Sequence, residues 1–197
     1  GYQSDLDLVF LCDDPDPESD ALYSRLVRRM MSALTVKTSS GKLFDVDLRL
    51  RPNGENGLAV SSFDMFSRYQ RNVDGNGAWL WEHQALTRAR FVAGDPDLGR
   101  KFEAERVAIL REPRNRDALK VEVSAMRAKM LEGHPNSSGL FDLKHDRGGM
   151  VDVEFIVQYL VLGWSAEFPE LVNNFGNILL LEMCARLGLI AEASAAR

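Results

Sequence analysis

The sequence predicts an α+β protein, in which a small α/β sheet domain is followed by an α-helical domain. Two runs of strand-like alternation with a helical stretch between them predict the sheet domain. Beyond residue 62 the apolar residues recur at helical spacing instead. We therefore assign residues 1–62 to a sheet domain and residues 63–197 to a helical domain that walls its site.

The first strand is predicted at residues 4–11, where apolar residues alternate with Asp5 and Asp7. Alternate side chains of a strand share a face, so these two carboxylates lie side by side. Like charges this close repel each other unless a cation lies between them, and Mg²⁺ prefers hard oxygen ligands. The alternative interpretation is a solvated edge strand with two surface aspartates.

The second strand is predicted at residues 42–51, and its polar face carries Asp45, Asp47, Arg49 and Arg51. If this strand pairs with the first, Asp47 joins the two earlier carboxylates, and the arginines extend the same face with groups that suit phosphate. Three carboxylates with arginines form the layout of a two-metal site for phosphoryl or nucleotidyl transfer. Ordinary solvated strand polarity is the alternative for Asp45 and Arg51.

Helices are predicted from apolar spacing and end signals. A helix starting at Ser19 or Asp20 packs on the sheet through a stripe of Tyr23, Leu26, Val27, Met30 and Leu34. The next segments are a helix capped by Ser62, a helix at 78–92, a stop and restart at 94–96, and a helix marked by a stripe of Leu98, Phe102, Arg106 and Ile109. They are followed by a helix around 119–130, an extended stretch at 139–144, a central helix at 150–163 and a last helix around 178–185.

Composition limits the possible partners. The net charge of −5, without a basic stripe, argues against nucleic acid, and the most apolar run, 155–164, is too short to span a membrane. Cys12 and Cys184 lack metal-ligand spacing and are predicted to be buried free thiols in a reducing cytosol. Both ends of the chain look cut, which indicates a fragment of a longer polypeptide.

Four strings carry a family resemblance: residues 4–10 (SDLDLVF), 46–52 (VDLRLRP), 81–86 (WEHQAL), and 141–144 (FDLK) with 148–155 (GGMVDVEF). They resemble glutamine synthetase adenylyltransferase, a bacterial regulator of nitrogen assimilation within the DNA-polymerase-β-type nucleotidyltransferase superfamily. The resemblance covers nearly the whole chain. The superfamily's phosphate-holding glycine turn would fall before Gly1.

The resemblance implies a cytoplasmic bacterial enzyme that uses ATP and two Mg²⁺ ions, with glutamine synthetase and the PII signalling protein as partners. Asp5, Asp7 and Asp47 would be the catalytic, metal-binding carboxylates. The candidate nucleotide-binding residues are Ser4, Arg49, Arg51, Lys144, Gly148, Gly149 and Glu154. A plain turn is the alternative for the two glycines, a buried salt bridge for Lys144 with Glu154, and a solvated hydroxyl for Ser4.

Family members carry two related modules, one that attaches AMP to a tyrosine of glutamine synthetase and one that removes it by phosphorolysis. Residues 81–84 and 149–160 are more similar to the attaching module. Two alternatives stay open: the removing module, which uses the same carboxylates, and a fragment that binds glutamine synthetase without catalysis.

Overall fold

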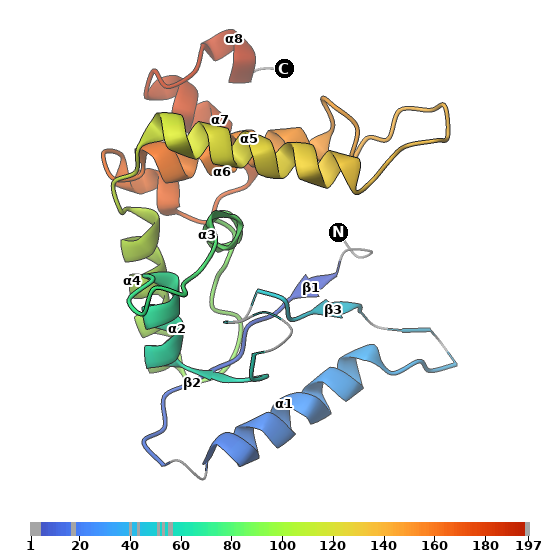
Figure 1. Cartoon of the computed structure of the whole chain (residues 1–197), viewed down its shortest axis with the longest axis vertical. Coiled ribbons are helices and arrows are strands. Elements are labelled where there is room, and N and C mark those ends of the chain that lie inside the picture. Colours follow the sequence, from blue (N-terminus) through green and yellow to red (C-terminus); the bar gives the residue numbers. More distant parts are fainter. Residues whose placement is uncertain are drawn as a thin grey trace. The chain divides into compact units, whose positions relative to one another are not determined.

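The computed structural model describes residues 5–16, 19–39, 41–42, 44–50, 52, 54 and 57–195. The chain forms two compact units: unit 1 comprises residues 1–78 and 93–102, and unit 2 comprises residues 79–92 and 103–197. The described residues are mostly helical, with short parallel strands, as expected for an α+β protein (Figure 1). The assignment of catalysis to residues 1–62 stays a prediction.

Unit 1 contains two pairs of parallel strands. β1 (Leu6–Asp7) pairs with β3 (Val46–Asp47), and β2 (Leu11–Cys12) pairs with β4 (Ser61–Ser62). The predicted pairing of the two acidic strands is therefore confirmed. Their predicted lengths are wrong, because each strand is only two residues long. The Asp47 carboxylate accepts the backbone N–H of Arg49 at 2.8 Å, an Asx turn that ends β3.

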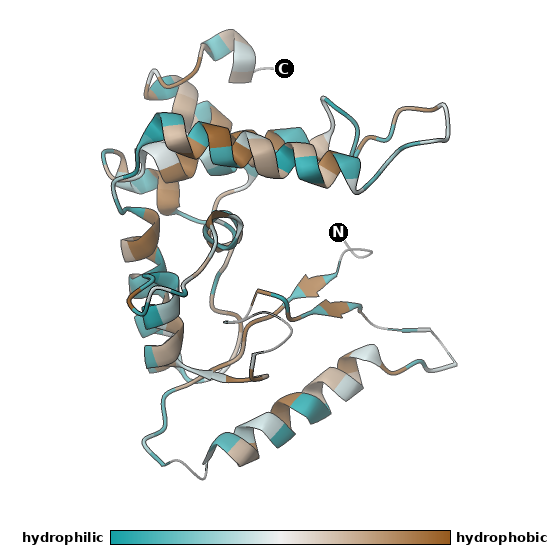
Figure 2. Ribbon diagram, viewed as in Figure 1, coloured by the Kyte–Doolittle hydropathy of each residue, from teal (hydrophilic) through white to brown (hydrophobic). Residues whose placement is uncertain are grey.

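Helix α1 (Ser19–Thr35) has the predicted start, and hydrophilic and hydrophobic residues alternate around it (Figure 2). Its buried contact is Val27, which packs with Cys12 and Val60, while Tyr23 and Met31 flank them. The predicted stripe is partly wrong, since Leu26 and Met30 are exposed. The ridge that faces the strands follows i, i+4 spacing through Tyr23, Val27 and Met31 and leaves the neighbouring ridge to solvent.

Helix α2 (Phe63–Gln70) begins where the sequence predicts, because the Ser62 hydroxyl accepts the N–H of Met65 at 3.2 Å. Phe66 is almost fully buried, and its ring lies 5.9 Å from the ring of Phe102. Phe102 belongs to the first part of helix α4 (Pro96–Leu110), which starts after the predicted stop at Gly94.

Unit 2 contains the rest of α4 and the following helices: α3 (Leu80–Leu86), α5 (Arg116–Glu132), α6 (Met150–Trp164), the 3₁₀ helix η2 (Pro169–Val172), α7 (Asn177–Arg186) and α8 (Glu192–Ala195). Its core joins α6 to η2 and α7 through Val157, Leu160, Val161, Leu171, Leu180 and Cys184. The prediction of a central, apolar α6 is confirmed for the half of the helix that carries these contacts.

Two predictions in unit 2 are wrong. The helix expected at 78–92 ends at Leu86, because the Thr87 hydroxyl bonds the carbonyl of Gln84 at 2.7 Å and competes with the helical pattern. The stretch at 139–144 is a series of turns instead of an extended segment, because the Asp142 carboxylate accepts the N–H groups of Lys144 and His145.

Both cysteines are buried free thiols, as predicted. Burial raises the pKa of the Cys184 thiol to about 11. Within the described part of the chain, every helix is too short or too polar to cross a lipid bilayer.

Candidate active site

The acidic strands of unit 1 bring the predicted carboxylates together. β1 and β3 pair in parallel with Asp7 directly opposite Asp47, and Leu8 donates its N–H to the Asp47 carbonyl at 2.9 Å. Asp5 lies two residues before Asp7, on the same face of the strand. The short sheet therefore brings the Asp47 side chain to Asp5 and Asp7, although Asp47 lies 40 residues after Asp7 in the sequence.

The electrostatics of this cluster are unfavourable when it is fully ionised. Partial burial raises the pKa of the Asp7 carboxyl, and the negative charges of Asp47 and Asp5 raise it further. Arg49 opposes this shift. A cation placed among the three carboxylates would remove the repulsion between them.

Arg49 lies within the cluster. Its guanidinium pairs with the Asp47 carboxylate, donating from Nε at 2.7 Å, and the Asp47 side chain is mostly buried while that of Arg49 is exposed. The exposed Arg49 guanidinium could therefore turn from Asp47 to an incoming phosphate, provided that a cation takes its place beside the buried Asp47 carboxylate. The other two predicted contacts of unit 1, Ser4 and Arg51, lie outside the described residues.

Within the described residues, no group of three or more His, Cys, Asp or Glu side chains already has the spacing of a metal site. The donor types nevertheless fit Mg²⁺, because all three are carboxylates and they repel one another. Asp47 would have to exchange its Arg49 partner for the metal.

The remaining predicted nucleotide contacts lie in unit 2, around the start of α6. Gly149 is the N-cap of this helix, and Gly148 has a φ of +84°, which favours glycine. The N–H of Gly148 donates to the Asp152 carboxylate at 2.5 Å, and the N–H of Gly149 donates to the Asp146 carbonyl at 2.9 Å. The two groups expected to face a phosphate thus have acceptors within the protein.

Lys144 and Glu154 are both exposed, which contradicts the alternative of a buried salt bridge. A partly buried ion pair that sequence reasoning missed lies nearby, between Arg127 and Asp152. Arg127 donates from Nε to Asp152 at 2.5 Å and from its terminal nitrogen to the His145 carbonyl at 2.7 Å. The signal for Asp152 was its place in the first turn of a helix, where a carboxylate is favourable.

The family model for glutamate-ammonia ligase adenylyltransferase matches residues 1–105, more than half of the chain. The chain belongs to this family.

Relatives from this family are identical to the chain at more than half of the aligned positions. Identity is 58% over 178 residues with a Ralstonia nicotianae protein, 56% over 197 residues with one from Burkholderia mallei, and 55% over 197 residues with one from Aromatoleum aromaticum. The alignments cover 90%, 99% and 100% of this chain but only 19%, 21% and 21% of the relatives. Each relative is a bifunctional glutamine synthetase adenylyltransferase/adenylyl-removing enzyme, and the chain spans about a fifth of its length.

Proposed function

We propose that the chain is a catalytic module that transfers AMP from ATP to a tyrosine of glutamine synthetase and releases pyrophosphate. The observation that carries this proposal is the register of β1 and β3, which sets Asp7 opposite Asp47 and close to Asp5. The names of the relatives supply the substrates.

In this proposal Asp5, Asp7 and Asp47 hold Mg²⁺, which, when bound, would neutralise the triphosphate and the leaving pyrophosphate. Asp47 lies nearest the attacking phenol and accepts its proton. Such a base is needed because the pKa of a tyrosine is near 10. Arg49, released from Asp47, contacts a phosphate oxygen. Ser4, Arg51, Lys144, Gly148, Gly149 and Glu154 are proposed as the further nucleotide contacts.

The second candidate is the reverse task, phosphorolytic removal of AMP from the same tyrosine, because the relatives are named for both activities. The same carboxylates serve either direction. We favour attachment because residues 81–84 and 149–160 are more similar to the attaching module. Association with the PII signalling protein and a cytoplasmic location are part of the same proposal.

The test uses a complete polypeptide: the Aromatoleum aromaticum relative with its aligned segment replaced by residues 1–197, hereafter the chimera. Attachment is measured as transfer of label from α-labelled Mg-ATP to glutamine synthetase. Removal is measured as phosphate-dependent release of ADP from modified glutamine synthetase. The variant is Asp7→Asn, and the matched control is Asp45→Asn, an exposed carboxylate that immediately precedes β3, the partner strand of β1.

We expect Asp7→Asn to abolish attachment and to spare removal. The loss should exceed the 10–100-fold typical of removing a residue that only supports a metal ligand, so roughly a hundredfold or more. Asp45→Asn should leave both activities unchanged. Loss of removal alone would assign the chain to the removing module. Retention of both activities would refute catalysis by these carboxylates and support a non-catalytic binding role.

A further inference from the structure

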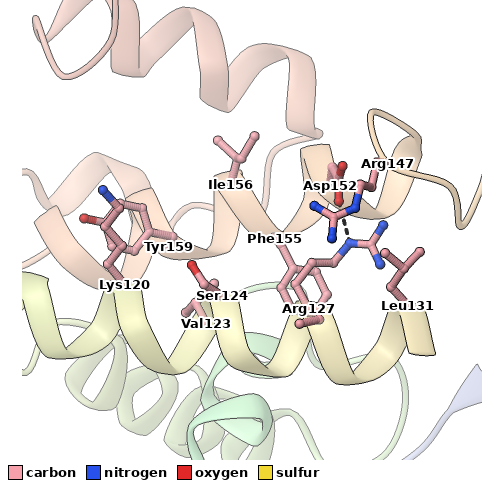
Figure 3. Close-up of a pocket in the computed structure, with 11 residues that line it drawn as sticks. Lys120, Val123, Ser124, Arg127, Leu131, Arg147, Asp152, Phe155, Ile156 and Tyr159 are labelled. Carbon is pink, nitrogen blue, oxygen red and sulfur yellow. Dashed lines mark hydrogen bonds and ion pairs between the residues drawn. The ribbon is translucent and has the colours of Figure 1, made fainter. Parts of the chain in front are cut away.

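A groove of about 450 Å³ runs between α5 and α6 of unit 2 (Figure 3). Val123 and Phe155 provide apolar surface along it. Lys120 and Tyr159 lie at one end, while Leu131 and Arg147 lie at the other. Among the lining residues, Lys120, Arg127 and Arg147 outnumber the single acid, Asp152, which Arg127 already neutralises. The groove is therefore apolar along its length and has a basic side chain at each end.

The sequence of α6 conflicts with this open surface. A helix that is apolar nearly all round is normally buried on every side. In α6, however, Ile156 in the groove is 52% exposed, and Met150 and Val153 extend the exposed apolar surface toward the helix start. A small ligand within the groove would leave these two neighbours uncovered, so a longer occupant fits the surface better.

The dimensions suit a helix. The lining residues of α5 run from Lys120 to Leu131, and eleven helical steps span roughly 16 Å, or about three turns. An amphipathic helix recognises such a groove through apolar residues at i, i+3 or i+4 and i+7. Acidic residues flanking that stripe would complement Lys120 at one end and Arg147 at the other.

We propose that the α5–α6 groove is the docking site for an amphipathic helix with acidic flanks. The helix comes from the part of the same polypeptide that lies outside residues 1–197. The length of the relatives, about five times that of the matched segment, supplies ample chain for such a helix. Docking would bury the exposed side of α6 and tie this module to the rest of the enzyme.

The test measures thiol accessibility at Ser124→Cys, which points into the groove, with Glu122→Cys on the opposite side of α5 as the matched control. The native Cys12 and Cys184 are buried and contribute little background. Maleimide labelling is followed at the peptide level in the isolated 197-residue chain and in the chimera. Hydrogen exchange of the unsubstituted α5 and α6 peptides provides a readout that needs no substitution.

We expect both thiols to react readily in the isolated chain, and only Ser124→Cys to slow, by about tenfold or more, in the chimera. Lys120→Glu should restore part of that reactivity, whereas Lys129→Glu, an exposed lysine elsewhere on α5, should not. Equal rates in the two proteins would overturn the proposal. So would protection that grows with the concentration of the isolated chain, which would indicate a second copy, or protection that requires added glutamine synthetase.

Protection of Ser124→Cys in the isolated chain at every concentration would also overturn the proposal, because residues 1–197 would then cover the groove themselves. None of these outcomes depends on adenylyl transfer, so failure of this proposal and failure of the proposed function are distinguishable. If a cysteine variant does not fold, hydrogen exchange of the α5 and α6 peptides in the unsubstituted proteins tests the proposal instead.

Discussion

Arg106 is a buried cation whose loss should destabilise unit 2. It is 4% exposed and donates to the Val172 carbonyl at 3.0 Å and to the Glu103 carboxylate at 2.9 Å. A third contact, to the Leu86 carbonyl at 3.5 Å, is long enough to add little. The guanidinium thus connects α4 to η2 through the buried carbonyl of Val172.

Replacing Arg106 with Met keeps most of the apolar volume and removes every donor. The cost is about 1–3 kcal/mol for the carbonyl and about 1.5–3 kcal/mol for the charged bond. The second figure must be discounted because the Glu103 side chain is 36% exposed and regains water. The variant also no longer has to bury a charged guanidinium, and this gain offsets a further part of the lost stability. We expect a net loss of about 3 kcal/mol in the free energy of unfolding, or roughly 6–12 °C for a chain of this size.

Urea unfolding followed by circular dichroism measures this loss, with Arg111→Met, an exposed arginine, as the control. Arg106→Lys should fall between the wild type and Arg106→Met, because an ammonium keeps the charge but lacks the planar fork. A loss below about 1 kcal/mol for Arg106→Met, comparable to a surface substitution, would refute the assignment of a structural role to these contacts.

Three further outcomes can be checked by the same unfolding assay. Gly149→Ala should destabilise strongly, because its Cβ would lie 2.6 Å from the Leu143 carbonyl oxygen. Gly148→Ala should cost only about 1–2 kcal/mol, because alanine is strained at a positive φ. Equal losses of stability for the two variants would contradict the crowding at Gly149. Ser62→Ala should cost about 1 kcal/mol by removing the cap of α2, and no change would show that the cap is dispensable. Hydrogen bonds from His145 and from backbone N–H groups lower the pKa of the Asp142 carboxyl. The stability that this carboxylate contributes is therefore present above its unfolded pKa and is lost as the pH falls through its folded pKa. Asp142→Asn should make the free energy of unfolding less dependent on pH in the acid range, and an unchanged pH dependence would refute this linkage.

The pairing of the acidic strands could be predicted because alternation reports which residues share a face. Apolar residues on one side of each strand place Asp7 and Asp47 on the polar sides, and the structure pairs the two strands with these residues directly opposite each other. The strand ends could not be predicted in this way. They depend on the Asp47 side chain capturing the N–H of Arg49, a local bond that competes with continued alternation.

Periodicity alone also misjudged which residues face the core. In α1 the buried ridge lies one step beyond Leu26 and Met30, because the direction of packing is set by Cys12 and Val60 on other segments. In α4 the predicted stripe of Leu98, Phe102, Arg106 and Ile109 was correct in spacing. Nothing in that spacing indicated that Arg106 is buried and donates to backbone carbonyls of distant segments.

The two glycines before α6 show how a motif can be located correctly and still be given an incomplete explanation. Gly148 and Gly149 do open the helix, but the Asp152 carboxylate already occupies the position at which an incoming anion would meet the Gly148 N–H. Asp152 is held there by Arg127 as well, and these hydrogen bonds hold its pKa low against the opposing effect of burial. A nucleotide phosphate at this place would have to displace a carboxylate that keeps its negative charge. The crowding of its backbone already explains the need for glycine at 149, so the proposed phosphate contact adds a second role in which the Gly149 N–H exchanges the Asp146 carbonyl for a phosphate oxygen.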